Sequence, residues 1–255
     1  MGGGTLAVVQ SCYVPWKGYF DLIRHADLFV LFDDAQYTVR DWRNRNRIKT
    51  KDGVKWLSIP VEVSGRRTQR IRDVRIADAG WRARHWKTIA AAYARAGCFR
   101  DYRDELEAAY ARAASPWLSE VNRQFTELIC RWLGISTPLA WSSDFALADG
   151  RNTRLIELCL QTGARTYLSG PSARGYLDLE AFAAAGVEVA FIDYTRYTAY
   201  PQVHLPFEHR VSALDLVLNT GPDARRYLLP APPCKSSDQP SAPGRPLPPA
   251  PSHEP

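Results

Sequence analysis

The fold is decided by residues 5–50, TLAVVQSCYVPWKGYFDLIRHADLFVLFDDAQYTVRDWRNRNRIKT. Two short apolar runs, TLAVV (5–9) and LFVLF (28–32), have the β-branched and aromatic residues typical of buried strands. Pro15 and Gly18 break the chain between them, and residues 19–26 can form a short helix. A strand, a helix and a second apolar strand of this length predict a βαβ unit of a parallel sheet.

The same pattern returns in the second half of the chain, after a long helical segment. Apolar residues recur at helical spacing from Trp81 to Tyr93, and Gly134 ends the last of three predicted helices. Further strands are predicted at 55–61, 71–76, 139–141, 166–168 and 187–192. We therefore predict an α/β fold, with a three-layer parallel-sheet core built of βαβ units and a helical insertion at about 79–134.

The predicted domain covers residues 1–229, and a tail of different composition follows it. Ten of the 26 residues from 230 to 255 are proline, and apolar side chains are almost absent. Such a segment cannot bury enough surface to offset the entropy of ordering, so we predict a disordered Pro-rich tail. It could serve as a spacer or dock an SH3-like module.

Composition narrows the class of protein. The chain has 255 residues, is 45% apolar and carries a net charge of +6, which favours a small anionic partner. It has neither the roughly 18 consecutive apolar residues of a membrane span nor a secretory leader, so we predict no membrane span and a cytoplasmic location. Nucleic-acid binding is disfavoured because the basic residues gather in one segment. The sequence names no cofactor and leaves the oligomeric state open.

The five cysteines are dispersed and have no metal-ligand spacing, so we interpret them as reduced thiols. Cys12 lies inside the first turn, but the sequence places no base beside it to activate a nucleophile. No motif indicates a metal site.

Polar and aromatic residues follow both predicted strands of the first βαβ unit. Parallel sheets gather ligands at the carboxyl ends of their strands. The candidates there are Gln10, Pro15, Trp16, Asp33, Asp34 and Gln36. Asp33 and Asp34 suit acid/base catalysis, although a turn cap and an ion pair with nearby arginines would explain the same two residues.

Three arginines alternate with amide residues in the segment DWRNRNR (41–47). In an extended strand Arg43, Arg45 and Arg47 share one side, and their guanidinium forks suit phosphate or carboxylate. Asn46 lies on the other side. The alternative is a surface strand with ion pairs to Asp41 and Asp52.

Two later loops add candidates. Ser169, Gly170 and Ser172 follow a predicted strand, where small residues let backbone N–H groups approach an anion, although a tight turn needs the same residues. His209 lies in an aromatic loop just before Ser212 and is the best candidate for a general base.

The order of these motifs resembles the WbqC-like family over about residues 5–229. The resemblance rests on QSCYVPWKGYFDLI (10–23), ADLFVLFDDAQYTVRDWRNRNRIKT (26–50), YLSGPSARGYLD (167–178) and PQVHLPFEHRVSALDLVLNTGPDARRYL (201–228). The motif positions carried over are Gln10, Pro15, Gly18, Asp33, Asp34, Gln36, Arg45, Asn46, Arg47, Ser169, Gly170, Pro171, His209, Ser212, Asp215 and Asn219.

The resemblance implies a role in O-antigen or other surface-polysaccharide biosynthesis. The resulting hypothesis is a transferase or sugar-modifying enzyme that acts on an activated, nucleotide- or carrier-linked anionic substrate, either a sugar or an acyl or aminoacyl donor. Asp33, Asp34 and His209 are its predicted catalytic residues, and the other candidates bind substrate. The alternative is a non-catalytic scaffold protein of a glycan-assembly complex.

Overall fold

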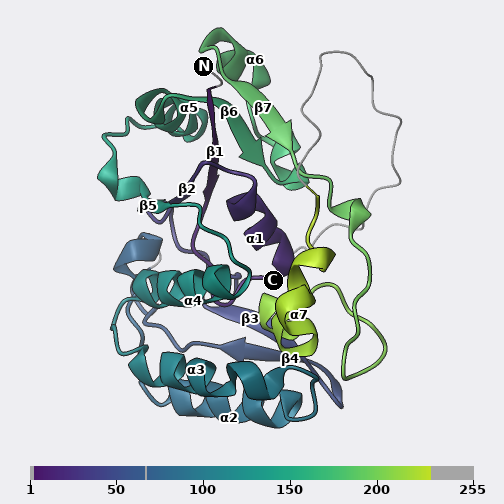
Figure 1. Cartoon of the computed structure of the whole chain (residues 1–255). Helices are drawn as coiled ribbons and strands as arrows, with labels where there is room; N and C mark the ends of the chain where they lie inside the picture. Colours follow the sequence, from purple (N-terminus) through teal and green to yellow (C-terminus); the bar gives the residue numbers. More distant parts are fainter. Residues whose placement is uncertain (1–2, 67, 231–255) are drawn as a thin grey trace.

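The N-terminal strand β1 (Gly4–Val9) is the central strand of a parallel sheet in a computed structural model that describes residues 3–66 and 68–230 (Figure 1). Within those residues the sheet has five strands in the order β5-β2-β1-β6-β7. The other four are β2 (Leu28–Leu31), β5 (Leu139–Trp141), β6 (Ala164–Ser169) and β7 (Glu188–Phe191). The predicted α/β class is confirmed, with helices flanking a mostly parallel sheet.

Side chains alternate along the strands between two separate cores. Ala7 and Phe29 enter the larger core, which also contains residues of α1 (Lys17–Arg24), α4 (Leu118–Trp132) and α7 (Ala213–Thr220). Leu6 and Val30 enter the smaller core, with residues of α5 (Arg151–Thr162) and α6 (Leu179–Ala184). The finer expectation of a three-layer βαβ arrangement stays a prediction.

A separate hairpin lies beyond the carboxyl ends of the sheet strands. Its strands β3 (Arg45–Thr50) and β4 (Gly53–Ser58) are antiparallel, and α2 (Trp81–Tyr93) and α3 (Phe99–Arg112) lie farther from the sheet (Figure 1). The helices α2, α3 and α4 fall in the predicted helical segment. The hairpin strand β4 ends sooner than predicted because Pro60 has no N–H to donate to a ladder.

The prediction of a strand at residues 71–76 is wrong. Residues Ile71–Asp73 form a 3-10 turn, and Ile76 makes only an isolated bridge with Val61. The amide of Arg72 donates to the carbonyl of Asp33 (3.0 Å), so this backbone binds the loop after β2 instead of a neighbouring strand. A tertiary contact has overridden a short run of β-branched residues that is typical of extended chain.

The remaining sequence predictions fall on several parts of the chain. The four cysteines of the described chain, Cys12, Cys98, Cys130 and Cys159, are free. The predicted tail lies outside the described residues, except for Pro230. In the part of the chain that the structure describes, no helix is both long and apolar enough to cross a bilayer.

The loop after β1 contains a strained residue, which a side chain of β3 holds in place. Val14 has φ 35°, a left-handed conformation that a β-branched residue rarely adopts. The side chain of Asn46 on β3 donates from Nδ2 to the carbonyls of Tyr13 (3.1 Å) and Val14 (3.0 Å). Its Oδ1 accepts from the amide of Arg47 (2.8 Å), so the whole carboxamide binds the protein's own backbone.

We expect Asn46→Asp to destabilise the protein by about 2–4 kcal/mol, because a carboxylate cannot donate and would face two buried carbonyl oxygens. Urea unfolding at pH 7 measures the effect. The exposed amide-to-acid change Gln161→Glu on α5 is the control, with an expected change of about 0.5–1 kcal/mol. Equal effects of the two substitutions would show that Asn46 does not hold the loop.

Candidate functional site

A polar pocket of about 280 Å³ lies where β2 and β5 end and α4 begins. We call it the acidic pocket, after the carboxylates among its lining residues Asp33, Asp34, Arg72, Asp73, Trp117, Ser119, Glu120, Trp141, Ser142 and Ser143. Two residues predicted to be catalytic are therefore brought together at one cavity. The remaining predicted site residues do not line it.

Asp33 is the buried carboxyl of the acidic pocket, with 1% of its surface exposed. Its Oδ1 accepts from the amide of Ser11 (2.7 Å), while Oδ2 is buried without a hydrogen-bond partner. Burial raises the pKa of Asp33 above its usual value, and the hydroxyls of Ser11 and Ser119 and the charge of Arg43 offset part of this shift. Asp33 therefore has an acceptor oxygen free and a raised proton affinity.

Asp34 has a different environment, although it is the next residue. Its Oδ1 forms an ion pair with Arg72 (2.8 Å), and its Oδ2 accepts from the hydroxyl of Ser142 (2.6 Å). Two adjacent carboxyls thus differ, one buried and half-partnered, the other ion-paired and hydrogen-bonded. Such a contrast lets one group exchange a proton while the other stays charged.

Sequence reasoning missed several lining residues. Ser142 follows the strand predicted at residues 139–141, so the carboxyl-end rule used for Asp33 could have found it. Trp117 and Ser119 begin a helix, and they reach the pocket only because α4 packs against the loop after β2. No local pattern predicts that contact.

Arg43 is separated from the other two arginines of its segment. It lies outside β3, where its guanidinium donates to the carbonyl of Gln10 (3.4 Å) and the sulfur of Cys12 (2.9 Å), and pairs with Asp41 (3.5 Å). Burial raises the pKa of the Cys12 thiol to about 11, so the sulfur is protonated at neutral pH and is a poor nucleophile. Gln10 contributes its carbonyl to this internal network.

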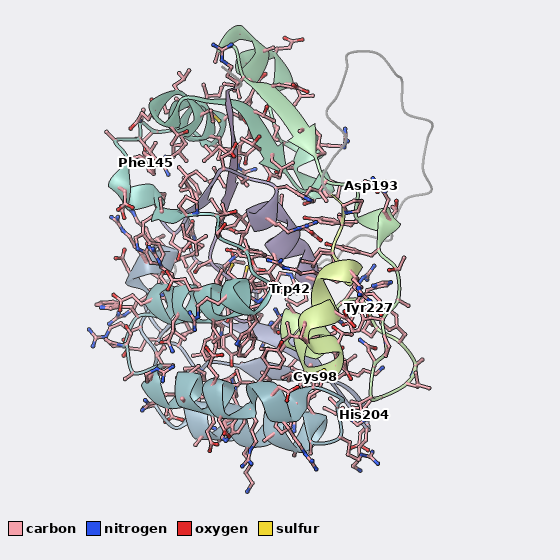
Figure 2. All side chains as sticks on the ribbon, in the orientation of Figure 1. Trp42, Cys98, Phe145, Asp193, His204 and Tyr227 are labelled. Carbon is pink, nitrogen blue, oxygen red and sulfur yellow. The ribbon has the colours of Figure 1, made fainter. Side chains whose placement is uncertain are left out.

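Arg45 and Arg47 lie on one face of the hairpin, with aromatic rings. The guanidinium carbon of Arg45 is 4.3 Å from the ring centre of Trp56, and that of Arg47 is 5.6 Å from those of both Trp56 and Trp42. Trp42 is labelled in Figure 2, in the middle of the molecule near α4 and α7. Both arginines remain candidates for binding an anion.

Lys17, which the sequence reasoning passed over, is 2% exposed at the start of α1. Its Nζ lies 4.1 Å from the ring centre of Tyr197 and 5.1 Å from that of Tyr200, and it donates to the carbonyl of Thr198 (3.4 Å). Burial lowers the pKa of Lys17 to about 8, and Asp21 offsets part of the shift. Its position directly after the predicted Pro-Trp turn was the available signal.

His209 lies beside this lysine rather than at the acidic pocket. Its ring packs on Phe207 (4.5 Å between centres) and Tyr197 (6.3 Å), and its Nδ1 is buried without a partner. Burial and the charge of Lys17 lower the pKa of His209, so its imidazole is neutral at pH 7. His209 and Asp33 thus belong to different groups of residues.

The other predicted binding residues have local structural contacts. The ring of Trp16 packs on that of Tyr194, with 4.9 Å between ring centres. A Cβ on Gly18 would collide with the indole of Trp16, so the close contact between Trp16 and the backbone at position 18 requires glycine. The Pro15 carbonyl accepts from Ala213, Ser212 caps α7, and Gln36 bridges Arg70. The remaining three form the turn after β6: the Ser169 carbonyl accepts from Ile192, Gly170 precedes a 3-10 turn, and Ser172 is exposed.

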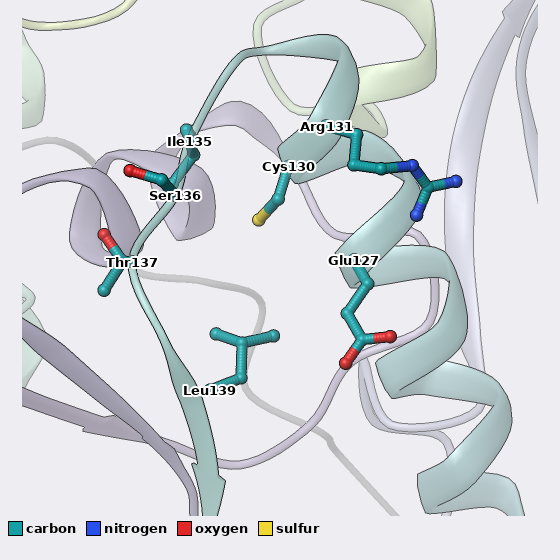
Figure 3. Close-up of a pocket in the computed structure, with 7 residues that line it drawn as sticks. All are labelled: Glu127, Cys130, Arg131, Ile135, Ser136, Thr137 and Leu139. Atoms are coloured by element: carbon teal, nitrogen blue, oxygen red, sulfur yellow. The ribbon is translucent and has the colours of Figure 1, made fainter.

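A second hollow, of about 310 Å³, contains none of the predicted residues (Figure 3). It lies between the end of α4 and the segment leading into β5. Its charged residues pair with neighbours, Glu127 with Arg123 (2.7 Å) and Arg131 with Glu105 (3.0 Å). Burial raises the pKa of the Cys130 thiol to about 12. We assign no function to this hollow.

We expect the Asp33→Asn protein to be at least as stable as the wild type at pH 7. Just above the usual carboxyl pKa of 3.8, the folded protein binds more protons at this position than the unfolded chain, so the contribution of Asp33 to stability falls as pH rises. The advantage of the variant should therefore grow from pH 4 to pH 7 in urea unfolding.

The exposed change Asp104→Asn on α3 controls for the loss of one negative charge. Destabilisation of Asp33→Asn at pH 7 by more than about 1 kcal/mol would mean that an ionised Asp33 stabilises the fold, contrary to this assignment.

A second expectation concerns Lys17. Between its lowered pKa of about 8 and the ordinary 10.5, the unfolded chain binds more protons than the folded protein. The contribution of Lys17 to the free energy of unfolding therefore rises with pH in that window, and the Lys17→Met variant lacks this rise. Urea unfolding at pH 7, 8, 9 and 10 should show the wild type gaining on the variant. A difference that stays constant with pH would contradict the assignment.

Comparison with known proteins identifies the family. The chain is 47% identical over 223 residues to the uncharacterised protein Rv1507c of Mycobacterium tuberculosis, a match that covers 88% of this chain and 96% of that protein. No solved structure matches the chain. The model of the WbqC-like protein family matches residues 10–227, from the first turn to the last described 3-10 helix. The chain therefore belongs to the WbqC-like protein family.

Proposed function

We propose that the protein is a transferase or sugar-modifying enzyme of surface-polysaccharide biosynthesis, such as that of O-antigen, and that it acts on an activated anionic substrate. The observation that carries the proposal is the pair Asp33 and Asp34, which face one pocket in unlike environments. Membership of the WbqC-like family supports the biological setting, since the resemblance to that family implies polysaccharide synthesis.

The lining of the acidic pocket suits a sugar. Carboxylates and serine hydroxyls can bind the hydroxyl groups of a ring, while Trp117 and Trp141 offer apolar faces. Its volume of about 280 Å³ is just below the roughly 300–1,000 Å³ common for ligand sites. The pocket therefore fits one small polar group, and the larger part of an activated donor would lie outside it.

The two carboxyls have distinct roles in this proposal. The free Oδ2 of Asp33 accepts the proton of an acceptor hydroxyl while the hydroxyl oxygen bonds to the transferred group and the leaving group departs with its electron pair. Asp34, held by Arg72 and Ser142, orients the acceptor. His209, the other predicted base, has no contact with this pocket and keeps no step in the proposal.

Replacing Asp33 with asparagine tests the chemistry. The carboxamide of the Asp33→Asn variant would keep an oxygen for the amide of Ser11 but cannot take a proton, so we expect product to fall by about 10²–10⁴-fold while the fold is retained. The measurement is restoration of the surface glycan in cells that lack the native gene, together with transfer from candidate nucleotide-linked sugars or acyl donors in vitro.

Asp104→Asn is a suitable control, since it makes the same carboxyl-to-amide change at an exposed position on α3, outside the pocket. Full glycan synthesis with Asp33→Asn would eliminate the proposed role. Glycan synthesis that survives every pocket substitution, with loss only on removal of a partner protein, would favour the scaffold alternative.

A further inference from the structure

Two arginines on the hairpin share a face with a partly exposed tryptophan. In the antiparallel register Arg47 pairs with Trp56, and Arg45 pairs with Ser58, so Arg45, Arg47 and Trp56 project to the same side. Trp56 is 43% exposed, and its ring lies 5.4 Å from that of Trp42. We call these four residues, Trp42, Arg45, Arg47 and Trp56, the arginine–tryptophan face.

The two arginines of this face have no ion-pair partner among the described residues. Within residues 3–66 and 68–230, neither Arg45 nor Arg47 forms an ion pair, whereas Arg43 pairs with Asp41 and Arg72 with Asp34. The Nε atoms of both arginines are buried without a partner. Guanidinium groups with one nitrogen withdrawn from water and no counter-ion are suited to bind an anion.

Charged groups of both signs lie near Arg47. The segment that follows Pro206 lies beside it, and the amide of Ser212 donates to its carbonyl (2.8 Å). Glu208 acts on Arg47 with an opposite charge, and Arg210 acts on it more weakly with a like charge. A side-chain oxygen of Glu208 accepts from the amide of Arg210 (2.7 Å), so this carboxylate binds backbone and forms no ion pair with Arg47 within the described residues.

The tryptophans fix the direction of the guanidinium groups. Stacking over an indole restricts an arginine while leaving its terminal N–H groups free to bind a ligand. Residues two apart in a strand are separated by roughly 6.6 Å, so two fixed forks can bind the oxygens of two successive phosphates. A single monovalent anion needs no such arrangement.

Resting on the function proposed above, we propose that the arginine–tryptophan face binds the diphosphate group of the activated donor. The acidic pocket holds one small group, so the diphosphate must bind outside it. Tyr37 joins the two regions: it follows Asp33 and Asp34 in the loop after β2, Arg45 and Arg43 act on its phenol, and its hydroxyl is buried without a partner. A nucleoside diphosphate and an isoprenyl diphosphate share this chemistry.

Calorimetric titration of the full chain with inorganic pyrophosphate tests the site. We expect pyrophosphate to bind more tightly than sulfate at equal ionic strength, and Arg45→Gln and Arg47→Gln each to weaken binding by about tenfold or more. Arg100→Gln and Arg103→Gln, both on the exposed surface of α3, are the matched controls and should bind as the wild type does. Equal weakening by all four, or no preference over sulfate, overturns the proposal.

The Trp56→Ala variant distinguishes a site in which the indole orients the arginines from attraction of the anion by positive charge alone. It removes no charge but frees Arg45, so we expect pyrophosphate affinity to fall several-fold, with the thermal melt showing that the variant is folded. Trp132→Ala, an indole elsewhere on the surface, is its control. Unchanged affinity in folded Trp56→Ala would mean that the indole does not organise the site, and it would overturn the proposed geometry.

The source of the diphosphate is decided by two further ligands, a nucleoside diphosphate and a short isoprenyl diphosphate. Whichever binds at least tenfold more tightly than pyrophosphate identifies the donor class. If neither does, the face does not serve an activated donor and the proposal fails. Asp33→Asn distinguishes the two proposals: normal pyrophosphate binding with lost product supports both, whereas normal binding with normal product removes only the proposed chemistry.

Discussion

The clamp of Asn46 on the backbone of Tyr13 and Val14 is the interaction on which the surrounding structure depends. It holds a left-handed valine, and so it lets the chain turn sharply between β1 and α1. The same loop gives the Ser11 amide to Asp33 and the Pro15 carbonyl to α7. One side chain on the hairpin thereby positions segments from both ends of the described chain.

Charge is distributed unevenly over the residues that gather around this loop. Asp34 and Arg43 have partners of opposite charge, and each is accounted for by the fold. Asp33, Lys17, Arg45 and Arg47 lack such a partner in the described ion pairs, although Lys17 has two tyrosine rings. An unpaired buried charge costs stability, which makes these groups candidates for a functional role.

The sequence predicted what depends on local pattern and missed what depends on packing. The apolar runs 5–9 and 28–32 became β1 and β2, because periodicity acts over a few residues. The β-branched residues at 71–76 also predicted a strand, but no described neighbour offers it a ladder, and the amides of Ile71 and Arg72 bind the loop after β2. At the site, the carboxyl-end rule located Asp33, whereas the depth of Lys17 depends on distant tyrosines that no local pattern places beside it.

The burial of Lys17 by Tyr197 and Tyr200 also sets an order of events in folding. The carbonyl of Thr198, between these two tyrosines, accepts from the lysine across 181 positions of sequence, and Asp215 in turn accepts from Tyr200 (2.8 Å). During synthesis Lys17 therefore stays exposed to water until almost all of the described chain has left the ribosome and residues 197–200 can cover it. A chain in which Lys17 still reacts with an amine reagent has not yet enclosed this lysine.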